Sequence, residues 1–286
     1  SPDPHAERLT EALAFLTGRG QYNIEQDMPR ITTGLLSTLY PQLVAPIPSQ
    51  SVVQFEVDVD QGLPAGGAEV PRHTSLYLEA PTGETCQFRT AYPLTLWPFS
   101  VTEVALEPRD RHEVLAGAHE VEAVLRMRLR CEDGTWAGYE AEALRLHLAG
   151  DPQLTSTLYE MLFAHRQRVV LLGEDRRAPA FLPEDALRPV GFEDEDALLP
   201  SPHHGHAAYR LIQEYATFPQ KYLFADLHYL DRVPEGTYVD VLVLLDRSPE
   251  GAPQVGAHNV RLHCTPAVNL FSRTTEPIHL DQRQVE

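Results

Sequence analysis

An almost continuous apolar run, YVDVLVLL from Tyr238 to Leu245, constrains the fold of this chain more than any other segment. A run of this kind is typical of a central β-strand that is covered on both faces. A second segment, Val121 to Cys131, alternates apolar residues with Arg126, Arg128 and Arg130, which is the period of a half-buried strand. A strand covered on both faces needs packed layers above and below it. The two segments therefore predict a β-rich core.

Further strand signals are spread along the chain. Between Ser51 and Val59, apolar and polar residues alternate with a period of two, which predicts another half-buried strand. The 24 scattered prolines favour many short elements over long helical bundles. Shorter strands are expected at Ser75 to Glu79, Cys86 to Thr90, Leu144 to Leu148, Val169 to Leu172, Tyr222 to Leu230, Val260 to Cys264 and Ile278 to Leu280.

Two short helices are expected near the N-terminal end. The first begins at Asp3-Pro4, where a capping carboxylate precedes proline at the first helical position, and it ends between Gly18 and Gly20. The second runs from about Pro29 to Tyr40, where Pro41 ends it. Each helix carries one apolar stripe, so neither can form a core alone and both must dock on the remaining chain or on a partner. We therefore expect a protein interface that includes Leu9, Leu13, Leu16, Leu35 and Leu39.

Two more helices are predicted further along. Asp151-Pro152 opens one of them, and its apolar face carries Leu154, Leu158, Met161 and Leu162. The other lies in the segment from Gly191 to Leu230, where Phe218-Pro219 ends it. Its apolar face consists of Ala208, Leu211, Ile212 and Tyr215. We expect the acidic loop, helix and aromatic strand of this segment to form a packing unit without reactive chemistry.

The fold class that these elements predict is α+β. Strands and helices follow one another without a regular βαβ alternation, so we expect mostly antiparallel or mixed short strands with interspersed helices and a short N-terminal helical segment. The expected divisions are an N-terminal helical segment at 1–46, a β-rich domain with one helix at 47–190, and a second α+β subdomain at 191–286. The sequence leaves open whether the last two are continuous.

Composition narrows the functional classes. The formal charge is −18, which repels phosphate backbones and anionic membrane surfaces and argues against nucleic-acid binding. Three distant cysteines, Cys86, Cys131 and Cys264, form no Cys-x-x-Cys pair, and no long apolar span is present. We expect a reduced, cytoplasmic setting with no direct membrane insertion. The abrupt start and stop of the chain suggest a fragment of a longer protein.

The sequence nominates no catalytic, cofactor-binding or metal-binding residue. His203, His204 and His206 form the one histidine cluster, but no cysteine or carboxylate pair completes a ligand set, so a solvated loop is favoured. Asp58 and Asp60 begin like a calcium loop, yet Leu63 occupies the position that requires glycine. The acidic run from Glu193 to Asp196 is more typical of a solvated loop than of a calcium site.

One enzymatic or binding alternative stays open. Carboxylates are plentiful, and aromatic residues gather around Trp97 and between Tyr209 and Tyr229. A carbohydrate-binding module or a hydrolase could use these groups. It would need a cleft with two carboxylates of displaced pKa, or an aromatic platform open to solvent.

Five ordered blocks carry a family resemblance over nearly the whole chain. They are DPHAERLTEALAFLTGR, LYPQLVAPIPSQSVVQFEV, CQFRTAYPLTLWPFSV, ALLPSPHHGHAAYRLIQEYATFPQKYLFADL and HCTPAVNLFSRTTEPIHLD. Together they resemble TssF, also called ImpG or VasA, a baseplate subunit of the type VI secretion system. The chain is far shorter than a full family member, and GRGQYNIEQDMPR is a divergent version of the link between the first two helices.

The resemblance implies a structural role without catalysis or cofactors. Subunits of this family join TssG, typically two copies to one, and build a wedge that also carries TssK. Six wedges surround the VgrG spike and form the platform on which the sheath assembles. The resemblance thus implies TssG, TssK, a second copy of TssF, the spike and the sheath as partners. It also implies a location in the cytoplasm at the inner face of the inner membrane.

Overall fold

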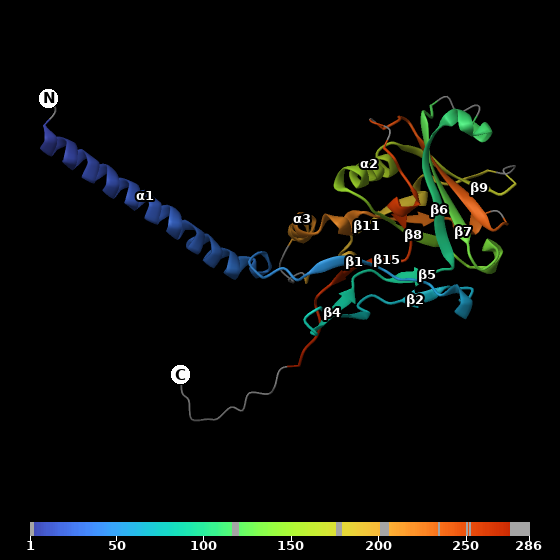
Figure 1. Ribbon diagram of the computed structural model, residues 1–286, viewed down its shortest axis with the longest axis horizontal. Coiled ribbons are helices and arrows are strands. Elements are labelled where there is room, and N and C mark those ends of the chain that lie inside the picture. The colour runs from blue at the N-terminus through green and yellow to red at the C-terminus, as the bar shows by residue number, and fades with distance from the viewer. Residues whose placement is uncertain are drawn as a thin grey trace. The chain divides into compact units, whose positions relative to one another are not determined.

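A computed structural model describes residues 3–115, 120–175, 179–200, 206–233, 235–249, 251 and 253–274 (Figure 1). The chain divides into two compact units, and both are discontinuous in sequence. The first comprises Ser1–Ile47 and Leu199–Gln213, and the second comprises Pro48–Leu198 and Glu214–Glu286. The predicted domain boundaries at residues 46 and 190 stay a prediction.

The first unit is dominated by one helix, α1 (Pro4–Leu39). Asp3 caps it as expected, because its carboxylate accepts the His5 N–H at 3.0 Å. Beyond α1, the Tyr40 ring packs on Tyr209 with the ring centroids 5.2 Å apart. The Gln213 side-chain amide also donates to the carbonyl of Gln42 at 3.0 Å. These contacts join the end of α1 to the first part of α3 (Ala207–Thr217).

The prediction of two N-terminal helices was wrong, because α1 runs without interruption through Gly18, Gly20 and Pro29. A glycine inside a helix costs only about 1 kcal/mol relative to alanine, and proline about 3 kcal/mol. Two side-chain hydrogen bonds bridge the expected link at helical i, i+4 spacing. Gln21 donates to Glu25, and Gln26 donates to Tyr22, each at 3.1 Å.

A five-stranded antiparallel sheet forms the centre of the second unit, in the order β10-β9-β13-β7-β6. Its strands are β6 (Phe99–Pro108), β7 (Ala123–Cys131), β9 (Arg166–Gly173), β10 (Ala180–Phe181) and β13 (Tyr238–Leu245). The predicted bounds of β13 are confirmed. Val241 and Val243 join the main core, whereas Leu242 and Leu244 join a smaller cluster on the opposite face. This two-sided burial explains the continuous apolar run.

Three smaller sheets complete the described part of this unit, in the orders β11-β12-β8-β14, β1-β15-β4-β3 and β2-β5. All of their pairings are antiparallel. The strands are β1 (Gln50–Gln54), β2 (Ala68–Val70), β3 (Ser75–Glu79), β4 (Thr85–Thr90), β5 (Leu94–Leu96), β8 (Ala143–Leu148), β11 (Leu187–Val190), β12 (Phe224–His228), β14 (Val260–Arg261) and β15 (Cys264–Val268). Helix α2 (Pro152–Phe163) buries Leu158, Met161 and Leu162 in the main core. The predicted α+β, β-rich class is confirmed.

Two predicted strands differ from the structure. The strand expected from Ser51 to Val59 ends at Gln54, and Val59–Gln61 forms a 3₁₀ turn in which the Asp58 carboxylate accepts the Asp60 N–H. The strand expected from Val260 to Cys264 is divided into β14 and β15. His263 between them has a φ of 59°, which no regular strand accommodates, so the two pieces join different sheets. The strand expected at Ile278 to Leu280 lies outside the described residues.

Candidate protein-interaction surfaces

The predicted interface residues all lie on α1, and all are exposed. The solvent-exposed fractions of Leu9, Leu13, Leu16, Leu35 and Leu39 lie between 57% and 72%. In the described part of the chain, α1 buries no residue at all. An amphipathic helix gains most of its stability from packing its apolar face, so this face indicates a binding partner. That the five leucines form an interface stays a prediction.

The middle of this apolar stripe was not predicted, because it lies in GRGQYNIEQDMPR, the expected link between two helices. Ile24 and Met28 are also more than half exposed on the continuous helix. Leu13, Ile24 and Leu35 follow one another at intervals of eleven residues, and Met28 and Leu39 share this interval. An eleven-residue apolar period corresponds to about 3.67 residues per turn and favours right-handed supercoiling with partner helices. That spacing was the signal that could have revealed one long interface helix.

Helix α3 exposes most of its predicted apolar face. Ala208, Ile212 and Tyr215 are exposed and Leu211 is partly buried, whereas the buried positions are polar, Arg210 and Glu214. The end of the helix at Phe218-Pro219 is confirmed. Hydrophobic periodicity therefore identified the helix and its apolar face but not the side that is buried.

The polar side of α3 is held by a buried ion pair in the second unit. Glu214 and Lys221, the one lysine of the chain, are both fully buried, and Lys221 Nζ donates to Glu214 Oε2. The other carboxylate oxygen of Glu214 accepts the Leu198 N–H at 2.8 Å. Tyr92 Oη donates to the Lys221 carbonyl at 3.0 Å. The pair thereby connects the end of α3 to the following 3₁₀ turn (Pro219–Tyr222) and to Leu198, which lies shortly after the acidic run from Glu193 to Asp196.

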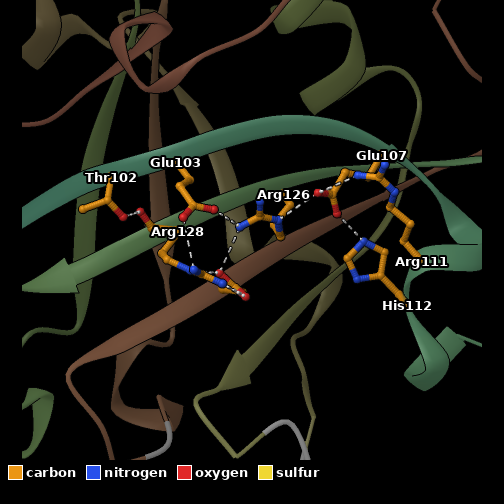
Figure 2. Close-up of polar contacts among 8 residues, drawn as sticks. Thr102, Glu103, Glu107, Arg111, His112, Arg126 and Arg128 are labelled. Carbon is orange, nitrogen blue, oxygen red and sulfur yellow. Dashed lines mark hydrogen bonds and ion pairs between the residues drawn. The ribbon is translucent and has the colours of Figure 1, made fainter.

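A network of arginines and carboxylates covers part of the central sheet (Figure 2). Arg128 on β7 binds Asp240 on β13 through two parallel contacts, Nε to Oδ1 at 2.7 Å and Nη2 to Oδ2 at 2.9 Å. The hydrogen bond to Asp240 raises the pKa of the Arg128 guanidinium above its usual value. Arg126 contacts Glu103 at 2.8 Å and Glu107 at 3.3 Å. These cross-strand pairs stabilise the sheet and leave its carboxylates engaged with cations.

The same pairing occurs in a second sheet. Arg145 on β8 faces Asp226 on β12 and donates to both of its carboxylate oxygens, at 2.8 and 2.7 Å. The planar guanidinium suits such bidentate pairs better than an ammonium group does. Arg128 and Arg145 thus each join two neighbouring strands of their sheets.

The two described carboxylates with a resolved pKa shift give no support to a general acid. Hydrogen bonds from Thr237 lower the pKa of Glu174, and a hydrogen bond from Arg188 lowers that of Asp185. Both shifts favour the ionised form, whereas a general acid at neutral pH needs a raised pKa. His206 accepts the Ala208 N–H at 3.1 Å, while His203 and His204 lie outside the described residues. Among the described residues, no three His, Cys, Asp or Glu side chains gather as a metal site.

The aromatic residues around Trp97 form core and not a platform. Phe99 stacks between Trp97 and Trp136, with ring centroids at 5.7 and 4.0 Å, and all three side chains are buried. Of the aromatic residues after Tyr209, Tyr222 is buried, and Tyr215 is exposed beside it. The buried cluster cannot stack on a sugar in this conformation.

The fold defines an α+β, β-rich protein with exposed apolar faces on α1 and α3. The family model described as "Type VI secretion system, TssF" matches residues 1–286. The chain therefore belongs to the TssF family, as its five sequence blocks predict.

Individual relatives agree with this assignment. The type VI secretion system component TssF1 of Pseudomonas aeruginosa PAO1 is 36% identical over 293 residues, which is 98% of this chain and 47% of the relative. A chain in the cryo-electron microscopy structure of the TssK-TssF-TssG baseplate subcomplex is 27% identical, with a TM-score of 0.73 over 96% of this chain and 51% of that chain. The chain thus spans about half the length of the relatives that it matches.

No helix within the described residues combines the length and the apolar character needed to cross a bilayer. The long helix α1 carries charged and amide side chains along its polar side, among them Arg8, Glu11, Arg19 and Gln26.

Proposed function

We propose that this chain is a structural part of the type VI secretion baseplate wedge. It assembles there with TssG, TssK and a second copy of TssF, around the VgrG spike, and helps to template sheath assembly. The observation that carries the proposal is the structural likeness to a chain of the TssK-TssF-TssG subcomplex over 96% of the sequence. This role places it in the cytoplasm at the inner face of the inner membrane.

The same proposal assigns no catalysis to the chain. Its support is chemical: the carboxylates on the central sheet are paired with Arg126 and Arg128, and Trp97 and Trp136 are packed inside the core. A hydrolase or carbohydrate-binding module would need such groups to face a substrate.

The interface of the proposed assembly includes the α1 stripe. Leu9, Leu13, Leu16, Leu35 and Leu39, joined by Ile24 and Met28, offer a continuous apolar row along a 36-residue helix. Burial of such side chains releases about 25 cal/mol for each Å² of apolar surface removed from water. We assign the row to packing against helices of TssG.

Two aspartate substitutions test this interface. The double variant Leu13→Asp and Leu35→Asp places two charges in the apolar row, where they would be desolvated in the complex. We expect co-purification with TssG to be lost. The fluorescence of Trp97 and Trp136, both in the second unit, should stay native because α1 belongs to the first unit.

The matched control adds the same two charges to the other side of α1. Thr33→Asp and Ser37→Asp lie two residues before Leu35 and Leu39, hence about 200° around the helix from them. This control should retain TssG. Equal recovery of TssG with both double variants would contradict the interface assignment, and loss with both would show that added charge, and not the stripe, is responsible.

A further inference from the structure

One edge of the four-stranded sheet is unpaired in the part of the chain that the structure describes. Strand β1 pairs with β15 on one side and ends the sheet order on the other. Asn269 donates to the Ser49 carbonyl and Phe55 donates to the His263 carbonyl, both at 2.9 Å. Because bonded and non-bonded pairs alternate in an antiparallel ladder, the odd-numbered residues of β1 bond to β15.

The even-numbered residues of β1 therefore direct their backbone groups away from the sheet. These are Gln50, Val52 and Gln54, whose N–H and C=O groups repeat at intervals of about 6.8 Å along the edge. Val52 lies opposite Pro266, which has no N–H to offer, as expected for a non-bonded pair. The edge thus presents a row of donors and acceptors spaced for another extended chain.

A groove of about 970 Å³ runs beside this edge. Gln50, Ser51 and Val52 contribute to one wall, and α2 contributes Tyr159 and Phe163 to another. The lining residues with formal charge are Glu160 and Arg261, one of each sign, although the chain as a whole carries −18. This balance favours an uncharged, largely apolar occupant.

Two buried polar side chains in the groove lack partners within the described residues. His147 is only 7% exposed, and neither of its ring nitrogens has a hydrogen-bond partner. The side-chain oxygen and nitrogen of Gln50 are likewise buried without one. An unpaired buried polar group is energetically unfavourable, so these groups indicate an occupant that supplies both donors and acceptors. A polypeptide backbone supplies both.

We propose that the β1 edge and its groove bind an extended peptide segment of a partner protein, which adds a strand to β1. Backbone groups of the peptide would pair with Gln50, Val52 and Gln54. Side chains at alternate positions, apolar or aromatic, would enter the groove against Tyr159 and Phe163. Strand addition of this kind draws affinity from main-chain hydrogen bonds and specificity from the pockets for alternate side chains.

The test uses the full 286-residue chain and a phage-displayed library of random seven-residue peptides. We expect the enriched peptides to share apolar or aromatic residues at positions i and i+2. On addition of a synthetic enriched peptide, the amides of Gln50, Val52 and Gln54 should become protected from hydrogen exchange. No enrichment, enrichment without alternation, or protection confined to other segments would each overturn the proposal.

Val52→Pro supplies the matched variant. Proline is tolerated on an edge strand where its missing N–H faces outward, so the sheet should persist while one docking donor is lost. We expect the peptide to bind about tenfold more weakly to Val52→Pro, whereas Val52→Thr, which keeps the N–H, should stay within about twofold. Unchanged affinity in Val52→Pro would overturn the proposal. If Val52→Pro does not fold, the exchange protection in the unaltered chain decides the matter.

Discussion

The buried pair of Glu214 and Lys221 offers the sharpest test of how the end of α3 is held. Both side chains are fully buried, so Lys221→Met would remove the ammonium group that contacts the Glu214 carboxylate in the core. Removal of one partner from a buried ion pair costs about 3–5 kcal/mol, because the remaining charge is desolvated and uncompensated. Methionine has nearly the length of lysine, so a cavity contributes little. We therefore expect a loss of about 3–5 kcal/mol in the free energy of unfolding of the second unit.

The double variant Glu214→Gln and Lys221→Met separates charge from packing. A glutamine oxygen can still accept the Leu198 N–H, which the carboxylate accepts at 2.8 Å. Replacement of a buried ion pair by neutral groups of similar size is often close to neutral in stability. We expect the double variant to recover most of the stability that Lys221→Met loses, so that the two changes are strongly non-additive.

Urea unfolding followed by tryptophan fluorescence measures this directly. Trp97 and Trp136 are the two tryptophans of the chain, and both are buried in the second unit that contains Glu214 and Lys221. The signal therefore reports that unit and not α1. A loss below about 1 kcal/mol for Lys221→Met, or a double variant less stable than the single one, would refute the desolvation argument.

Two further predictions concern the second unit. Burial lowers the pKa of His147 and of His263 to about 4, so the neutral form is favoured in the folded state. Below pH 6.5 the unfolded chain therefore binds more protons than the folded chain. The free energy of unfolding falls by about 3 kcal/mol per histidine as the pH drops from 6.5 to 4, and this contribution is fully present above pH 6.5. His147→Phe should flatten this decline in urea titrations across the range, and an unchanged slope would count against it. Gly191 has a φ of 109°, and a Cβ there would lie 2.8 Å from Tyr92 Oη. Gly191→Ala should lower the free energy of unfolding by about 2–4 kcal/mol, because it adds both backbone strain and overlap. Gly83 also has a positive φ but no atom lies near its Cβ position, so Gly83→Ala should cost only about 1 kcal/mol. Equal shifts of the melting temperature in the two variants would contradict this reasoning.

The sequence by itself determined the elements whose signal is local. The apolar run predicted the bounds of β13, and Asp151-Pro152 predicted the start of α2, where the Asp151 carboxylate accepts the Gln153 and Leu154 N–H groups. Both signals arise from neighbouring residues, through side-chain periodicity and helix capping. The five sequence blocks also identified the family, because their order is specific over nearly the whole chain.

Tertiary structure decided which side of an element is buried and which partner it joins. Sequence periodicity predicted a packing face that includes Ile212 and Tyr215, yet both are exposed, whereas Glu214 of the same helix is fully buried and bonds to Lys221 and Leu198. His263 divides one predicted strand between two sheets, and the strands that pair with the two pieces, β8 and β1, lie far away in sequence. The edge position of β1 among the described strands cannot be read from the sequence either, because it depends on which strands pair with β15. Burial and pairing are set by contacts between distant segments, and a local pattern carries no record of them.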